Sequence, residues 1–374
     1  MEDKQLINEI QDIDNQIASA FVRRMQLISQ LSQTNSSTGL IDREVIASVT
    51  RNQSEEIAGY IQALFHTILD LTRISQLKHE MSDKEMQLEM INALHHEKPL
   101  FPKNAIIACQ GIEGANSQHA CEKLFARPSI MYMSHFESVF SAVDKGLCQY
   151  GILPVENNLH GSVNEVYDLM RKHHFHIVRS VKVKINHTLL AKNDVPLSEI
   201  KEIYSHPQAL AQCGKYLKGL KHIKLTPCEN TAIAAKMVYE SSRKDIAAIS
   251  SLHCAELYHL YPLARQIQDS DHNYTRFICI AKEIELYSGA DKISLMFTIP
   301  HRPGELYGMI AKFSALGLNL TKLESRPIPG TDFEFMFYID LNASLHQKEV
   351  INLLASLGQV SDSFAFLGNY SEIG

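Results

Sequence analysis

The chain has 374 residues, of which 45% are hydrophobic and 21% charged, a composition typical of a folded protein with two or three domains. Its formal net charge is -6 and its Lys and Arg residues form no basic run, which argues against nucleic-acid binding through phosphate contacts. No apolar stretch approaches the roughly 20 residues that span a membrane, and the acidic N-terminus does not look like a signal peptide. We therefore expect a cytoplasmic protein.

The cysteines and histidines stand in no metal-binding pattern. The 7 cysteines are scattered singly, without a Cys-x-x-Cys pair, which favours free thiols in a reducing compartment. The 18 histidines include no His-Glu-x-x-His motif. The sequence therefore predicts no metal site.

Residues 1–95 are predicted to form an all-α region of three helices. Apolar residues recur at three- and four-residue steps from Leu6 to Leu31 and again from Ile57 to Leu71, with a short helix expected around residues 45–49. The third helix is expected to run to about Lys78. Three helices cannot bury so long an apolar stripe alone, so we expect a homodimer or homotetramer that forms through this region.

The next region, residues 103–283, has an α/β pattern. After a linker with two prolines, short apolar runs alternate with helical segments, and the length suits two small lobes with a cleft between them. The apolar runs are residues 105–108, 150–154, 177–178, 188–190, 246–249 and 277–280.

Residues 291–371 show a third pattern, α+β and ferredoxin-like. Strands are expected at 293–299, 319–327, 333–341 and about 359–367, and helices at about 304–315 and 345–357. The element order is βαββαβ. The sequence thus predicts a multidomain chain with an all-α, an α/β and an α+β region.

Polar turns stand at strand ends in the α/β region, where such folds place ligands. They are residues 111–117, 154–162, 204–213 and 273–277. Each turn has a purely structural alternative. Thr275 could be an ordinary β-branched strand residue, His206 could cap a turn, and Glu156 could bond backbone N–H groups.

The segments Glu156-Asn157, Tyr204 to Cys213 and Asn273 to Phe277 resemble the signatures of prephenate dehydratases. With the residues that follow, the resemblance covers about residues 103–370. It implies two α/β lobes like those of a periplasmic binding protein, with the active site in the cleft. The first lobe would be 103–182 closed by 265–283, and the second 183–264.

The resemblance implies conversion of prephenate to phenylpyruvate, carbon dioxide and water in phenylalanine biosynthesis. Formation of the aromatic ring drives this reaction, so no cofactor is expected. Arg276 suits a substrate carboxylate, Thr275 can hydrogen-bond or protonate the departing hydroxyl, and His206 or Glu156 would assist it. The residues expected to orient the substrate are Ser117, Asn157, Ser205, Gln208 and Phe277.

Residues 302–306 and 319–327 resemble an ACT domain of the phenylalanine-sensing type, which implies feedback by L-phenylalanine. A plain ferredoxin-like dimerisation module is the alternative. The residues expected to bind the effector are Gly304, Leu306, Asn319, Leu320, Glu324, Ser325, Arg326 and Pro327.

The helical region resembles the chorismate mutase domain that is fused ahead of some dehydratases. Its mutase-like site would comprise Arg24, Arg43, Glu44, Thr72 and Gln76. Ile7 and Asn35 replace two cations of that family, and Leu40 replaces an acidic residue. Losing one preorganised donor costs about 3–4 kcal/mol of transition-state stabilisation, so we expect a degenerate mutase domain. The alternatives are a bifunctional enzyme that also binds chorismate, and a non-catalytic amino-acid sensor.

Overall fold

The computed structural model describes residues 2–32, 45–51, 53–76, 84–220, 222–301, 304–328, 330, 334–361 and 363–374. The chain divides into two compact units. The first comprises Met1–His95 and Ile293–Phe366, and the second comprises His96–Lys292 and Leu367–Gly374.

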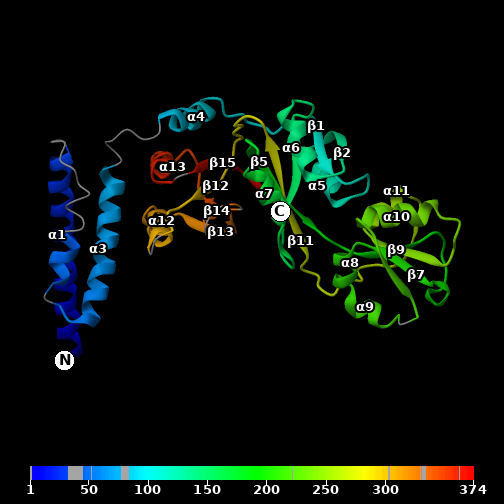
Figure 1. The fold of residues 1–374 in the computed structure, drawn as a ribbon, viewed down its shortest axis with the longest axis horizontal. Coiled ribbons are helices and arrows are strands. Elements are labelled where there is room, and N and C mark those ends of the chain that lie inside the picture. Colours follow the sequence, from blue (N-terminus) through cyan, green and yellow to red (C-terminus); the bar gives the residue numbers. More distant parts are fainter. Residues whose placement is uncertain are drawn as a thin grey trace. The chain divides into compact units, whose positions relative to one another are not determined.

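The helices of the first unit are α1 (Glu2–Ser32), α3 (Glu55–Gln76) and α4 (Lys84–His95), and residues 45–50 are also helical (Figure 1). The helices predicted from the apolar periodicity are thus present, whereas α4 was not predicted as a separate helix. The Arg24 guanidinium on α1 donates a hydrogen bond of 2.5 Å to the Thr72 hydroxyl on α3.

The first unit also contains a four-stranded sheet in the order β13-β14-β12-β15. Its elements are β12 (Lys292–Thr298), α12 (Glu305–Ala315), β13 (Asn319–Pro327), β14 (Phe335–Asn342), α13 (Lys348–Val360) and β15 (Phe364–Tyr370). The order βαββαβ agrees with the prediction. The last helix and strand begin at Lys348 and Phe364, later than the predicted 345 and 359.

The first lobe of the second unit is built on a seven-stranded sheet in the order β16-β5-β11-β3-β1-β2, with β4 paired to β3. The strands are β1 (Asn104–Gln110), β2 (Arg127–Met133), β3 (Tyr150–Asn157), β4 (Gly161–Ser162), β5 (His176–Lys184), β11 (Tyr274–Ala281) and β16 (Glu372–Ile373). Its helices are α5 (Asn116–Leu124), α6 (Phe136–Asp144) and α7 (Asn164–Met170). The late strand β11 lies antiparallel between β3 and β5, so the chain returns to the first sheet after the second lobe.

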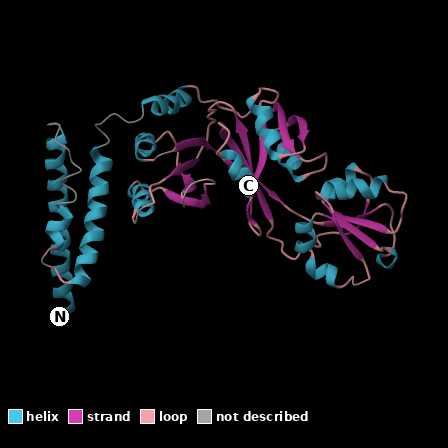
Figure 2. Ribbon diagram, viewed as in Figure 1, coloured by secondary structure: helices cyan, strands magenta, loops and turns pink. Residues whose placement is uncertain are grey.

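The second lobe has a five-stranded sheet in the order β10-β6-β9-β7-β8 (Figure 2). Its strands are β6 (Thr188–Ala191), β7 (Glu202–Ser205), β8 (Lys224–Pro227), β9 (Ile246–Ser250) and β10 (Tyr261–Ala264). Its helices are the 3-10 turn Leu197–Glu199, α8 (Pro207–Gln212), α9 (Gly214–Lys218), α10 (Thr231–Glu240) and α11 (Leu252–Leu257). Every residue of β9 is buried, as expected for a continuous apolar run in a central strand.

The boundary between the units falls inside β15, and the segment Leu367–Gly374 belongs to the second unit, although we expected the ferredoxin-like region to extend to residue 371. Its strand β16 pairs in parallel with β5, with Glu372 opposite Ser180. Gly368 has φ +147, and a Cβ atom there would lie 2.1 Å from the Ile177 carbonyl oxygen. Only glycine fits this close approach of two backbones.

All 7 cysteines are free thiols. Within the described ranges, no helix is long and apolar enough to cross a membrane. The same ranges contain no cluster of three or more His, Cys, Asp or Glu side chains that could hold a metal ion.

Candidate functional site

A cavity of about 520 Å³ lies in the second unit and receives residues from both of its lobes. The first lobe contributes β3, β11 and the start of α5, and the second contributes the starts of α8 and α10. Six of the predicted site residues line this cavity: Ser117, Asn157, His206, Gln208, Thr275 and Phe277. Three others, Glu156, Ser205 and Arg276, are not among its lining residues.

Thr275 presents its hydroxyl to the cavity from β11. Asn157 is its partner in the β3–β11 register, and the Asn157 Nδ2 group donates a hydrogen bond of 3.0 Å to Thr275 Oγ1. Asn157 is itself fixed, because its Oδ1 accepts from the backbone N–H groups of Leu159 and His160 at 3.0 and 3.1 Å. Because Thr275 Oγ1 accepts the hydrogen bond from Asn157, its own hydroxyl proton remains available to donate into the cavity.

A chain of hydrogen bonds extends from Asn157 into the second lobe. Asn157 Nδ2 donates to Asn273 Oδ1 at 2.8 Å, and Asn273 Nδ2 donates to Gln212 Oε1 at 3.0 Å. His187 Nε2 lies 2.6 Å from the same Gln212 oxygen. Since that oxygen accepts from Asn273, we assign the His187 proton to Nε2, which makes it a second donor.

Sequence reasoning did not assign Asn273, Gln212 or His187 to the site. Asn273 and Gln212 lie at the ends of segments 273–277 and 204–213, so their positions were a usable signal. His187 is a lone histidine before an apolar strand and carried no such signal. Burial lowers the pKa of His187, which keeps its ring neutral near pH 7.

His206 both caps a helix and lines the cavity. Its Nδ1 accepts a hydrogen bond of 3.3 Å from the Gln208 backbone N–H at the start of α8, and burial lowers its pKa. Because Nδ1 is the acceptor, the neutral ring carries its proton on Nε2 and can act as a donor. Ser205 has a different function, since its buried hydroxyl donates to the Ile249 carbonyl at 2.7 Å and ties β7 to β9.

Two helices, α5 and α10, begin at the cavity. Ser117 lies in the first turn of α5, and Asn230 caps α10 by accepting a hydrogen bond of 2.7 Å from the Ile233 N–H. Helix N-termini attract anions through unpaired N–H groups and the helix dipole. Among the cavity-lining residues in the described part of the chain, none is Lys or Arg, and Glu229 is the one carboxylate.

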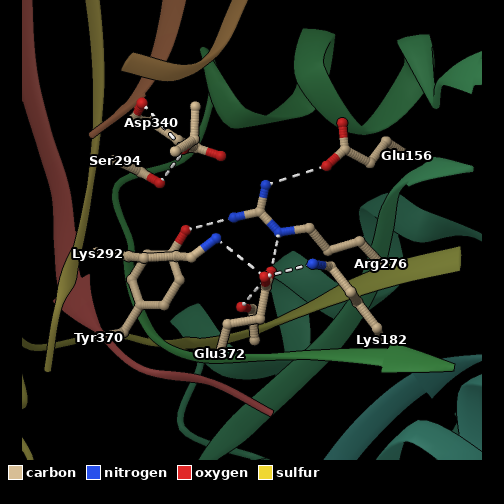
Figure 3. A network of polar contacts seen from close by, with 10 residues as sticks. Glu156, Lys182, Arg276, Lys292, Ser294, Asp340, Tyr370 and Glu372 are labelled. Carbon is tan, nitrogen blue, oxygen red and sulfur yellow. Dashed lines mark hydrogen bonds and ion pairs between the residues drawn. The ribbon is translucent and has the colours of Figure 1, made fainter. Parts of the chain in front are cut away.

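The structure does not place Arg276 where we expected it, at a substrate carboxylate. Successive side chains on a strand point to opposite faces, so Thr275 and Phe277 line the cavity while Arg276 points away from it. Its guanidinium is buried, with Nη1 3.1 Å from Glu156 Oε1, Nε 2.8 Å from Glu372 Oε2, and Nη2 donating to Tyr370 Oη at 2.6 Å (Figure 3). Glu156 is thus in this network and not in the cavity.

Glu372 joins Arg276 to two lysines, Lys182 at 2.8 Å and Lys292 at 2.9 Å (Figure 3). Burial raises the pKa of the Glu372 carboxyl. Hydrogen bonds from Lys182 and Lys292 and the charge of Arg276 outweigh that effect and lower the pKa to about 2. The carboxylate therefore stays ionised at all physiological pH values.

Two lobes around a polar cavity, with a threonine hydroxyl and a chain of amide and imidazole groups on its wall, define a two-lobed α/β protein with a site for a small polar molecule. Comparison with known proteins identifies the family. The model of the family described as prephenate dehydratase matches residues 107–285. Arogenate dehydratase 2 from Petunia hybrida is 37% identical over 281 residues, which cover 71% of this chain and 71% of that protein.

The bifunctional chorismate mutase/prephenate dehydratase of Escherichia coli strain K12 is 31% identical over 319 residues, or 84% of this chain and 79% of that protein. The solved structure of prephenate dehydratase from Arthrobacter aurescens in complex with L-Phe is 28% identical, with a TM-score of 0.66 over 71% of this chain and 90% of that chain. The chain belongs to the prephenate dehydratase family and is an enzyme of that family. The predicted family is confirmed, while the roles of individual side chains remain predictions.

The depressed pKa of Glu372 predicts an acid-sensitive contribution to stability. A carboxyl whose pKa falls from 4.5 to about 2 on folding stabilises the native state above about pH 4.5 and loses this effect as the pH falls toward 2. The full contribution is about 3 kcal/mol. We expect Glu372→Gln to lower the free energy of unfolding by roughly 3–5 kcal/mol at pH 7, because it removes the carboxylate that pairs with the buried Arg276 and the partly buried Lys292.

Denaturant unfolding of both proteins between pH 7 and pH 3.5 measures this effect, and the difference between them should shrink on acidification. The exposed Glu283→Gln variant is the control and should differ from the unmodified chain by no more than about 0.5 kcal/mol at each pH. A difference for Glu372→Gln that is independent of pH would contradict the assignment.

Proposed function

We propose that the chain converts prephenate to phenylpyruvate, carbon dioxide and water in phenylalanine biosynthesis. The observation that carries this proposal is the Thr275 hydroxyl, held by Asn157 on the wall of the cavity in a member of this family. In the reaction the bond to the ring carboxylate breaks and its electron pair enters the ring. The C4–O bond then breaks, and the departing hydroxide gains a proton to become water.

Thr275 is proposed to donate its hydrogen bond to the departing oxygen, where negative charge develops. A preorganised donor stabilises such charge because it needs no reorientation during the reaction. The chain from Asn157 through Asn273 and Gln212 to His187 keeps this wall of the cavity in one arrangement.

Substrate carboxylates are proposed to lie at the starts of α5 and α10, near Ser117, Gln208 and the His206 Nε2 group. Neutral donors suit a carboxylate that must leave as uncharged carbon dioxide. A cation beside it would stabilise the ground state more than the transition state and would slow the reaction. The lining described above, without Lys or Arg, is consistent with this requirement.

Arogenate is a second candidate substrate. It carries an amino group where prephenate has a keto group, and the carboxylate of Glu229 on the cavity wall could accept from its ammonium. The Petunia hybrida relative carries the name arogenate dehydratase. Parallel assays with the two substrates decide between them.

Thr275→Ala is expected to lower kcat with the proposed substrate by at least about 100-fold, the effect of removing one preorganised donor. Thr275→Ser keeps the hydroxyl and should retain most of the activity. Phenylpyruvate production at saturating prephenate gives kcat, and thermal unfolding checks that both variants are folded. Near-normal phenylpyruvate production by folded Thr275→Ala would refute the role of Thr275.

L-Phenylalanine is proposed to inhibit the enzyme by binding in the ferredoxin-like region of the first unit. A cavity of about 280 Å³ there is lined by apolar and aromatic residues, including Leu306, Phe335 and Phe337, and by Ser325. Gly304, with φ +90, caps α12 beside Leu306. The effector's ring suits the phenylalanines, and its carboxylate suits the start of α12.

Only two of the predicted effector residues, Leu306 and Ser325, line this cavity. The others named earlier are not among its lining residues, and Arg302 and Pro303 lie outside the described residues. The Arthrobacter aurescens relative was solved with L-Phe. Feedback requires that phenylalanine bind a less active state more tightly.

Isothermal titration of the full chain with L-phenylalanine should show saturable binding, and the same ligand should slow the dehydratase reaction. Leu306→Glu should abolish both effects by placing a charge in the apolar cavity. Ser314→Glu, an exposed position on the same helix, should preserve them. Absence of binding to the unmodified chain would exclude this effector.

The helical region is proposed to be a degenerate mutase domain that serves assembly of a homodimer or homotetramer. Ile7, where the related domain has Arg, is 59% exposed, and Leu6, Ile10, Ile13 and Ile17 on α1 are 52–59% exposed. Arg24 and Thr72 are brought together, whereas Asn35, Leu40, Arg43 and Glu44 and the Gln76 side chain lie outside the described residues. An apolar stripe along a helix is the surface that a second copy would cover.

The double variant Ile10→Glu/Ile13→Glu should therefore lower the mass measured by sedimentation equilibrium, because it places charges in the apolar contact. Gln11→Glu/Asn15→Glu, on another face of α1, should leave the mass unchanged. The unmodified chain should show no turnover of chorismate. An unchanged mass for the first variant, or clear chorismate turnover, would reject the proposal.

A further inference from the structure

The strands β3 and β11, which carry the proposed site, place different kinds of side chain on their two faces. In the β3–β11 register, Thr275 is opposite Asn157 and Arg276 is opposite Glu156. The first pair makes a hydrogen bond at the cavity, and the second makes an ion pair away from it. A displacement of Arg276 therefore moves the residue next to it, Thr275.

The register of this strand pair is irregular at the same point. Arg276 aligns with Glu156, but Phe277 aligns with Pro154, which leaves Val155 between the two positions as a bulge. A bulge interrupts the ladder of backbone hydrogen bonds and changes the direction of nearby side chains. Side-chain contacts must therefore fix the position of Arg276 at this point, where the backbone hydrogen bonds are interrupted.

Two of the contacts that hold Arg276 come from the segment Leu367–Gly374. Tyr370 Oη accepts from Arg276 Nη2 at 2.6 Å, and Glu372 Oε2 lies 2.8 Å from Arg276 Nε (Figure 3). Arg276 and Tyr370 are almost fully buried, at 6% and 1% exposure. A buried guanidinium has few alternative positions once such partners are in place.

The segment is itself anchored within the second unit. Its backbone pairs with β5, Asn369 Nδ2 donates to the Lys292 carbonyl at 2.9 Å, and the Tyr370 carbonyl accepts from the Asp291 N–H at 3.2 Å. Gly368 lies directly against the Ile177 carbonyl. Because the segment is held at these points, Tyr370 and Glu372 have defined positions and can hold the Arg276 side chain in place.

We infer that Tyr370 and Glu372 are positioning residues of the dehydratase site, which hold Arg276 against Glu156 at the bulge and thereby place the Thr275 hydroxyl. Neither residue is among those that line the cavity. This inference rests on the proposed function, since it concerns the same hydroxyl.

Tyr370→Phe is the sharpest test, because it removes one hydroxyl and leaves the buried ring. We expect kcat with prephenate to fall about tenfold and KM to change less than about twofold, since a small misplacement of a reacting group lowers the rate more than it weakens binding. The matched control is Ser371→Ala. It removes the hydroxyl that accepts from Arg179 at 3.1 and 3.2 Å, within the same segment but away from Arg276, and should leave kcat within about twofold.

A mutant cycle shows whether Tyr370 acts through Arg276. On an Arg276→Met background, Tyr370→Phe should cause no further loss of kcat, because the contact is already absent. If the losses of kcat from the two single variants multiplied in the double variant, that result would overturn the inference. So would unchanged kcat in folded Tyr370→Phe, or an equal loss in Ser371→Ala.

The two proposals fail in different ways. If Thr275→Ala is inactive and folded Tyr370→Phe behaves like the unmodified chain, only the positioning inference is lost. If Thr275→Ala keeps its activity, the proposed site itself is lost. Glu372→Gln, assayed where unfolding curves show it to be folded, is a second test, and it should also lower kcat with prephenate.

Discussion

A buried guanidinium is stable only where other groups replace the water that it has lost, and Arg276 obtains these groups from distant parts of the chain. Glu156 comes from β3, while Tyr370 lies 94 residues after Arg276 and Glu372 belongs to the same segment. Lys182 and Lys292 balance the second carboxylate. Removing either carboxylate would leave the buried guanidinium with less compensation for its charge, so these distant parts of the chain must come together.

This network and the proposed site lie on opposite sides of the same two strands. The network is charged and centres on the buried Arg276 and Tyr370, whereas the cavity is polar and is lined mainly by neutral donors. Such a division suits a reaction that expels carbon dioxide, because the strong charges support the strand without facing the carboxylate that must leave. The chain of hydrogen bonds to Gln212 and His187 extends the rigid wall into the second lobe.

The sequence predicted much of this arrangement. Local segments were enough to assign Thr275, Asn157, His206 and Gln208 to one site, because each stands at the end of a strand or the start of a helix. All four line the cavity. Arg276 and Glu156 were placed on the wrong side of the sheet. The alternation of side chains along a strand could have shown this, since Thr275 and Phe277 must face away from Arg276. Treating Thr275-Arg276 as one functional pair hid that signal.

Other features could not be predicted from local patterns. The role of Glu372 depends on three cations that lie far from it in the sequence, and β16 is too short for periodicity to detect. His187 and Asn273 acquire their meaning from Gln212, a partner in a different element. Tertiary contacts of this kind decide the function of a side chain without changing the pattern around it.

The return of Leu367–Gly374 to the second unit has a consequence for how the enzyme is made. During synthesis, residues 96–292 emerge well before their acidic partner Glu372, which follows only after the whole of 293–366. Until then the nascent sheet lacks its edge strand β16, and Arg276 lacks its contacts with Tyr370 and Glu372. Domains that emerge early usually fold early, but this one must wait to close a long loop. A recombinant fragment that ends near residue 283 would keep the cavity and omit the part of the chain that braces it.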